Sequence, residues 1–104
     1  PMKNLSENDW VAALSQQQEG KILDVRTLPE FEEGKIPEAI NLDILNPQEF
    51  MDGIEQLDKS FHYFVYCRAG SRSAQACAVM QQLGFEHTYN LEGGFSEWNG
   101  AVEY

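Results

Sequence analysis

Two patterns of apolar and polar residues alternate along this chain. Apolar runs at residues 21–26 and 62–66 predict strands, and the second run is apolar and aromatic throughout, which is typical of a strand covered on both faces. Between residues 73 and 83, apolar side chains recur at the helical spacing i, i+3, i+4 and i+7, at Ala76, Val79, Met80 and Leu83. The pattern therefore predicts a central strand followed by an amphipathic helix, which Gly84 ends.

The remaining segments continue this order of strand and helix. Ser6, Pro29 and Pro47 stand at positions that favour helix starts. The segment 36–42 predicts a turn followed by a short strand, and the segment 86–91 predicts the next strand. Strands that alternate with helices in a chain of 104 residues predict an α/β domain with a mostly parallel sheet.

Length, composition and charge narrow the classes of function. The chain carries 7 Lys and Arg against 17 Asp and Glu, a net charge of −10, so nucleic acid and anionic membranes are not expected partners. Its 2 cysteines are too few for a disulfide framework, and no apolar run has the length of a membrane span. We therefore expect a cytoplasmic protein with a single domain at residues 3–104. Pro1, which precedes the natural start Met2, is expected to be an added residue.

Cys67 stands where the predicted central strand gives way to the predicted helix. In a parallel sheet, ligands bind beyond the carboxyl ends of the strands, where helix N-termini offer free backbone N–H groups. Arg68 and Arg72 flank the same loop, and a thiol beside arginines at a helix start has a lowered pKa and acts as a nucleophile. Ala69 and Gly70 are small enough for the loop to curl, so that its N–H groups form an anion nest around the sulfur.

Four segments of the chain form a longer pattern: LDVR at 23–26, GKIPEAINL at 34–42, CRAGSRS at 67–73 and NLEGGFSEW at 90–98. In this order and spacing they resemble the single-domain rhodanese family, which is similar to thiosulfate sulfurtransferase. The resemblance implies a small domain with a roughly five-stranded parallel sheet, helices on both faces and a fifth strand around residues 3–5.

The same resemblance implies roles for the loop. Cys67 would carry sulfur as a persulfide, and the backbone of the following residues would bind the substrate sulfur: Arg68, Ala69, Gly70, Ser71, Arg72 and Ser73. The sequence departs from the family at Lys35, which is usually His, and at Glu38, which is often Gly. Both departures lie outside the segment 67–73, so they leave the expected chemistry unchanged.

The expected activity is a sulfur transfer in two steps. The Cys67 thiolate attacks the outer sulfur of thiosulfate or a similar anionic donor and releases sulfite, and a thiol or cyanide acceptor then removes the sulfur. Arg68 and Arg72 are expected to attract and orient the donor. No metal and no cofactor are expected, because neither histidine has a partner at the spacing of metal ligands.

Three other functions stay open at this point. One is a persulfide relay to a protein partner in cofactor or tRNA biosynthesis, whose rate would fall as salt screens an acidic docking face. A second is a non-catalytic interaction module, which the presence of Cys67 with both arginines disfavours. A third is a phosphatase, which is disfavoured because four residues separate Cys67 from Arg72 where the related phosphatases place five.

Other polar groups have simpler interpretations. Asp24 and Arg26 follow the first strong strand and are interpreted as a structural ion pair that ties neighbouring loops together. Cys77 belongs to the apolar face of the long helix and is interpreted as a core residue rather than as a resolving thiol. The acidic residues of the short helix after Pro29 are interpreted as a solvated face, with a docking surface as the alternative; they are Glu30, Glu32 and Glu33.

Overall fold

The computed structural model describes residues 2–104, so the expectation for Pro1 lies outside the described residues. It holds one five-stranded sheet in the order β1-β5-β4-β2-β3, and every neighbouring pair of strands is parallel. The elements are β1 (Lys3–Leu5), α1 (Glu7–Ser15), β2 (Gly20–Asp24), α2 (Leu28–Glu33), β3 (Ile40–Asn41), α3 (Pro47–Glu55), β4 (His62–Tyr66), α4 (Ser71–Gln82), β5 (His87–Leu91) and the 3-10 helix η1 (Phe95–Glu97). The predicted five-stranded parallel α/β fold is confirmed, including the short strand at residues 3–5.

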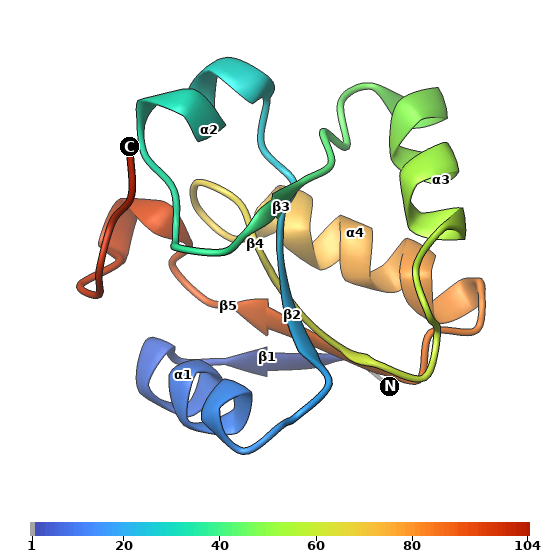
Figure 1. Cartoon of the computed structure of the whole chain (residues 1–104), viewed down its shortest axis with the longest axis horizontal. Coiled ribbons are helices and arrows are strands. Elements are labelled where there is room, and N and C mark those ends of the chain that lie inside the picture. Colours follow the sequence, from blue (N-terminus) through green and yellow to red (C-terminus); the bar gives the residue numbers. More distant parts are fainter. Residues whose placement is uncertain (1) are drawn as a thin grey trace.

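The central strand β4 is covered on both faces, as its apolar sequence predicts. Val65 belongs to a buried cluster that α3 and α4 complete, whereas Phe64 belongs to a second cluster around Trp10 of α1. Figure 1 shows α1 and the red C-terminal segment on one side of the sheet, with α3 and α4 on the other. The apolar residues of one strand therefore hold two layers of helices.

The helices α1 and α2 begin at residues whose side chains bond to their first N–H groups. Ser6 caps α1 by accepting a hydrogen bond from the Asp9 backbone N–H. Thr27 and Glu30 form a reciprocal capping box at the start of α2. The helix α4 begins at Ser71, two residues before the start that its apolar spacing predicts, so the loop after β4 is shorter than expected.

The end of β2 is fixed by the predicted ion pair, which the structure confirms. The Arg26 guanidinium binds the Asp24 carboxylate at 2.6 Å, and both side chains are buried. The same guanidinium donates to the Gly34 carbonyl, and the Tyr66 hydroxyl donates to Asp24. Because these bonds join β2, β4 and the segment after α2, they hold the carboxyl edge of the sheet in one arrangement.

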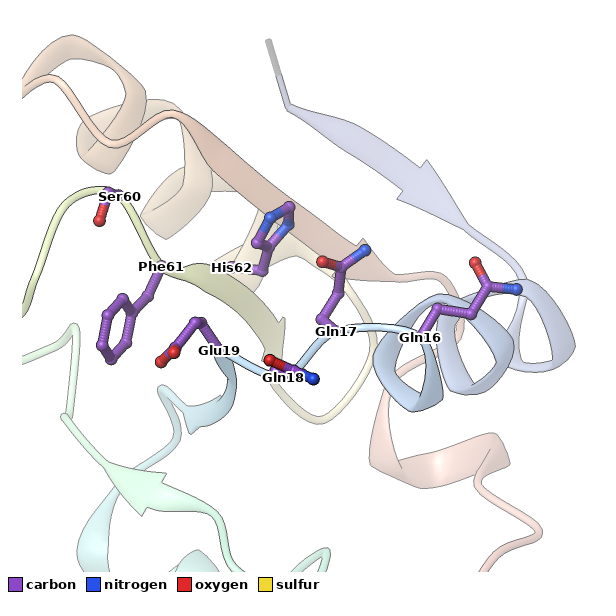
Figure 2. Close-up of a pocket in the computed structure, with 7 residues that line it drawn as sticks. All are labelled: Gln16, Gln17, Gln18, Glu19, Ser60, Phe61 and His62. Atoms are coloured by element: carbon purple, nitrogen blue, oxygen red, sulfur yellow. The ribbon is translucent and has the colours of Figure 1, made fainter.

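A broad hollow lies at the opposite edge of the sheet. It has a volume of about 580 Å³ and lies between the segment after α1 and the start of β4 (Figure 2). Its lining residues are Gln16, Gln17, Gln18, Glu19, Ser60, Phe61 and His62. No cysteine or arginine lines this hollow, so it is separate from the predicted chemistry.

Among the described residues, no helix combines the length and the apolar character that a membrane span requires.

Candidate active site

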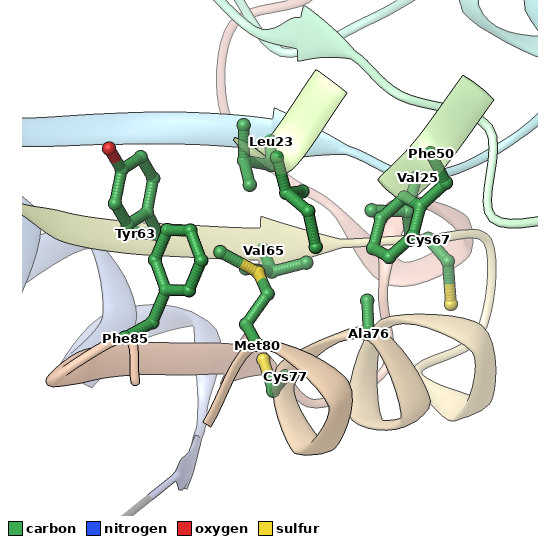
Figure 3. Packing of buried hydrophobic residues seen from close by; sticks show 11 residues of the cluster. Leu23, Val25, Phe50, Tyr63, Val65, Cys67, Ala76, Cys77, Met80 and Phe85 are labelled. Atoms are coloured by element: carbon green, nitrogen blue, oxygen red, sulfur yellow. The ribbon is translucent and has the colours of Figure 1, made fainter. Parts of the chain in front are cut away.

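Cys67 follows β4 directly and points toward the first turn of α4. Its side chain is 1% exposed and lies at one end of the buried cluster, beside Ala76 (Figure 3). The Gly70 backbone N–H donates to the sulfur at an N···S distance of 3.1 Å, and the Ser73 hydroxyl donates at 3.3 Å. Gly70 has a φ of 108°, a backbone conformation that favours glycine, and this curl turns the loop around the sulfur.

The loop lowers the pKa of the Cys67 thiol. Burial alone would raise that pKa, because it removes the thiolate from water. The Ser73 hydroxyl and the backbone N–H groups of Ser73, Gly70 and Ala69 donate to the sulfur and outweigh burial. The net result is a sulfur that ionises more readily than a free cysteine, as the sequence predicts from its place at a helix start.

The turn that follows β5, at residues 93–96, supports the loop that begins at Cys67. The Phe95 N–H donates to the Cys67 carbonyl at 2.8 Å, and the Ser96 N–H donates to the Arg68 carbonyl at 2.9 Å. Gly94 permits the approach, since a Cβ there would lie 2.5 Å from the Arg68 carbonyl oxygen and its φ is 57°. The Gly-Gly turn is therefore part of the active-site scaffold.

Asn90 of β5 holds the other side of the loop. Its buried amide donates to the Gly70 carbonyl at 3.2 Å and to the Asn4 side chain at 2.9 Å. The Ser73 hydroxyl oxygen also lies 3.2 Å from the Gly70 carbonyl oxygen, so its one hydrogen is shared between that oxygen and the sulfur. Fixing this carbonyl fixes the orientation of the loop whose Gly70 N–H meets the sulfur.

The two arginines lie beside the loop, but they are not free. Both bind Glu30 of α2: Arg72 through two nitrogens at 2.9 and 3.1 Å, and Arg68 through Nε at 3.0 Å. The interpretation of Glu30 as a solvated residue is therefore wrong, since its side chain is only 16% exposed and accepts from both cations. The reason is tertiary, because the turn before α2 brings this carboxylate over the loop. Glu32 and Glu33 are exposed, as expected.

These ion pairs change the electrostatics of both partners. Hydrogen bonds from Arg72 hold the pKa of Glu30 far below its usual range, against the effect of burial. The same bonds raise the pKa of Arg72. Both groups are thus charged throughout the neutral range, and the positive field near Cys67 is partly cancelled.

Cys77 has the role expected of it. It is fully buried on the sheet-facing side of α4, and burial raises the pKa of its thiol to about 12. Both cysteines are free thiols. Within residues 2–104, no group of three His, Cys, Asp or Glu side chains is arranged to hold a metal ion.

Comparison with known proteins decides the family. The family model described as a rhodanese-like domain matches residues 7–101. The chain belongs to the rhodanese-like domain family. It is thus a member of a sulfur-transfer family, in agreement with the resemblance read from its four sequence segments.

Individual rhodanese-like relatives match along most of the chain. It is 34% identical to YtwF of Bacillus subtilis over 98% of this chain and 95% of that protein. It is 36% identical to a protein of Allochromatium vinosum named sulfurtransferase, over 74% of this chain and 69% of that one. The crystal structure of a rhodanese-like domain protein from Staphylococcus aureus superposes with a TM-score of 0.82 at 27% identity, covering 98% of this chain and 97% of that one.

Three contributors to the rhodanese-like site escaped prediction. The sequence predicts a solvated face for Glu30, and it assigns Asn90 and Gly94 no role beyond their place in the segment 90–98. The capping-box spacing of Thr27 and Glu30 was the one local signal that this carboxylate is held in place. Nothing in the local sequence indicates which distant groups Asn90 and Gly94 meet.

Proposed function

We propose that this protein moves a sulfane sulfur from an anionic donor such as thiosulfate to a thiol or cyanide acceptor through a persulfide on Cys67. The thiolate forms a bond to the outer sulfur of the donor, and the donor S–S bond breaks with its electron pair leaving on sulfite. The acceptor then attacks the same outer sulfur, and the Cys67 thiolate leaves. The lowered pKa of Cys67 increases the fraction that is already thiolate, so the first step needs no separate general base.

The observation that carries this proposal is the ring of donors around the sulfur. The Gly70 N–H and the Ser73 hydroxyl both point at Sγ, so the loop is built to hold a negative charge on that atom. A persulfide places its charge one atom farther out, within reach of the same helix start. Because four residues lie between Cys67 and Arg72, one fewer than in the related phosphatases, the loop is expected to fit a sulfur atom better than a phosphoryl group.

The acceptor stays a prediction. A small thiol, cyanide or a protein thiol would each regenerate the Cys67 thiolate by the same attack. The proposed compartment is the cytoplasm, where thiols are kept reduced and a persulfide can be discharged.

Intact-protein mass after brief incubation with thiosulfate, without acceptor, tests the proposal. The wild-type protein is expected to gain the mass of one sulfur atom and to lose it when cyanide is added. Cys67→Ser should gain nothing, whereas Cys77→Ser, which removes the other thiol, should gain one sulfur like the wild type. No gain with thiosulfate or with an organic thiosulfonate would overturn the proposal, and a gain that Cys67→Ser retains would move the site elsewhere.

A further inference from the structure

The carboxylate of Glu30 is saturated with hydrogen bonds beside the active loop. Oε1 accepts from the Thr27 N–H at 3.0 Å, from the Thr27 hydroxyl at 3.1 Å and from Arg72 at 2.9 Å. Oε2 accepts from Arg68 at 3.0 Å and from Arg72 at 3.1 Å. The capping box fixes this side chain on α2, so its negative charge is a permanent part of the site.

Glu30 halves the positive charge that the loop offers to an incoming anion. Arg68 and Arg72 bring two positive charges, and one carboxylate leaves a net charge of one. The pair with Arg72 is largely sheltered, at 22% and 16% exposure, so salt screens it less than a surface pair. Because Coulomb energy is proportional to the charge of the donor, the loss of one positive charge costs a dianionic donor about twice the attraction that it costs a monoanionic donor.

The contacts also occupy the donor groups that would grip such an anion. Arg72 turns two of its nitrogens toward Glu30, the two-pronged geometry with which arginine binds a carboxylate, sulfate or sulfonate group. Arg68 is 60% exposed and has only its Nε on Glu30, so its terminal nitrogens face solvent. The paired end of Arg72 is therefore occupied, and Arg68 offers the more exposed N–H donors to the incoming anion.

We propose that Glu30 is a specificity-determining residue that disfavours dianionic sulfur donors relative to monoanionic ones. This inference rests on the proposed sulfur transfer and names the class of donor that the site prefers. The preferred donors carry one negative charge near the transferred sulfur, as organic thiosulfonates do. Thiosulfate, with two negative charges, becomes the weaker substrate.

Two donors allow the charge to vary while the reaction stays the same. With thiosulfate, Cys67 bonds to the outer sulfur and the S–S bond breaks to release sulfite, a dianion. With methanethiosulfonate, Cys67 bonds to the corresponding outer sulfur and the S–S bond breaks to release methanesulfinate, a monoanion. Both reactions leave the same Cys67 persulfide, and neither requires an oxidant or a reductant.

The test compares kcat/KM for both donors, with cyanide as acceptor, in Glu30→Gln and Glu32→Gln. Gln keeps the shape and can still accept from the Thr27 N–H, so α2 retains its cap. Glu30→Gln is expected to raise kcat/KM for thiosulfate about tenfold more than for methanethiosulfonate, the scale expected for one unit charge near a partly solvated site. Glu32→Gln removes the same net charge from an exposed position of α2 and should leave the ratio of the two donors unchanged.

A second measurement reads the local charge without any sulfur transfer. Cys67 is alkylated with iodoacetate, an anion, and with iodoacetamide, which is neutral, and Cys67→Ser supplies the background. The ratio of the iodoacetate rate to the iodoacetamide rate is expected to rise about tenfold in Glu30→Gln. This ratio cancels changes in loop order or in the fraction of thiolate, because both reagents use the same sulfur.

The outcomes separate the two proposals. An unchanged donor ratio and an unchanged alkylation ratio in Glu30→Gln would overturn the inference. An equal loss of rate with both donors would likewise overturn it, since Glu30 would then only position the loop. If the wild-type protein takes sulfur from neither donor while the alkylation ratio shifts as expected, the proposed sulfur transfer fails and the electrostatic role of Glu30 stands.

Discussion

The two cysteines of this chain have nearly the same burial and opposite chemistry. Cys67 is 1% exposed and Cys77 is 0% exposed, and both belong to the same apolar cluster. Yet the pKa of Cys67 is lowered, whereas burial raises the pKa of Cys77 to about 12. Burial therefore does not decide whether a cysteine is reactive in this fold.

The difference lies in the backbone N–H groups near each sulfur. Cys67 precedes α4, where the N–H groups at the start of a helix have no partner within the helix and are free to face the sulfur. Cys77 lies inside α4, where the N–H groups are already bonded to carbonyls, and the Thr88 hydroxyl is its side-chain partner. Position relative to the helix end thus lowers the pKa of one thiol and leaves the other as a core residue with a raised pKa.

The matched serine substitutions separate the two cysteines most strongly. Cys67→Ser is expected to lower the rate of sulfur transfer about a thousandfold or more, since a hydroxyl does not ionise near neutral pH. Cys77→Ser should keep the rate within about twofold and lower the free energy of unfolding by about 1–3 kcal/mol, because it buries a hydroxyl. Initial rates and urea unfolding curves measure both effects. Loss of activity in a folded Cys77→Ser variant would show that the Cys77 thiol is needed for sulfur transfer.

A pair of glycine substitutions tests the scaffold that distinguishes Cys67. Gly94→Ala places a Cβ 2.5 Å from the Arg68 carbonyl oxygen, so it should displace the loop, raise the pKa of Cys67 and slow sulfur transfer about tenfold or more. Gly84 also has a positive φ, of 95°, but a Cβ in Gly84→Ala would meet nothing closer than 3.8 Å. This variant should lower stability by about 1–2 kcal/mol and leave the rate unchanged. Equal rates in the two variants would show that the turn at Gly94 does not hold the loop.

The smallest effect concerns a single hydrogen bond. Ser73→Ala removes a hydroxyl donor worth about 1 kcal/mol, so the pKa of Cys67 should rise. The thiolate fraction grows as pH rises through the pKa, so a higher pKa means slower alkylation by iodoacetamide at neutral pH. The pH at half-maximal alkylation rate measures the shift. Ser15→Ala, in an exposed position of α1, is the control. An unshifted midpoint in Ser73→Ala would show that the Ser73 hydroxyl does not lower the pKa of Cys67.

The comparison of the cysteines was largely accessible from sequence. A run of apolar residues before Cys67 and an apolar helical repeat around Cys77 place the first at an element boundary and the second in a helix interior. That boundary is local information, because strand and helix periodicities are carried by neighbouring residues. The first residue of α4 is predicted less accurately, because Ser71 and Arg72 have no apolar side chain that would extend the helical repeat toward the N-terminus.

The strand at residues 3–5 shows where local information fails. Two of its three residues are exposed, and its sequence has no apolar alternation. It is a strand because it pairs with β5, with Lys3 opposite Tyr89 and Leu5 opposite Leu91. Resemblance to a family predicted it, whereas its own pattern did not.

By itself, the sequence determined the α/β order of elements, the place of Cys67 at the end of the central strand and the small residues that let the loop curl. Tertiary structure alone decided what surrounds that loop. Glu30 meets Arg72 across 42 positions of sequence, and Asn90 meets Gly70 across 20. Periodicity and turn residues act over a few neighbours, whereas the partner of a charged or polar group depends on which segments the packed sheet brings together. For that reason the chemistry of Cys67 could be read from the chain, and the charge of its surroundings could not.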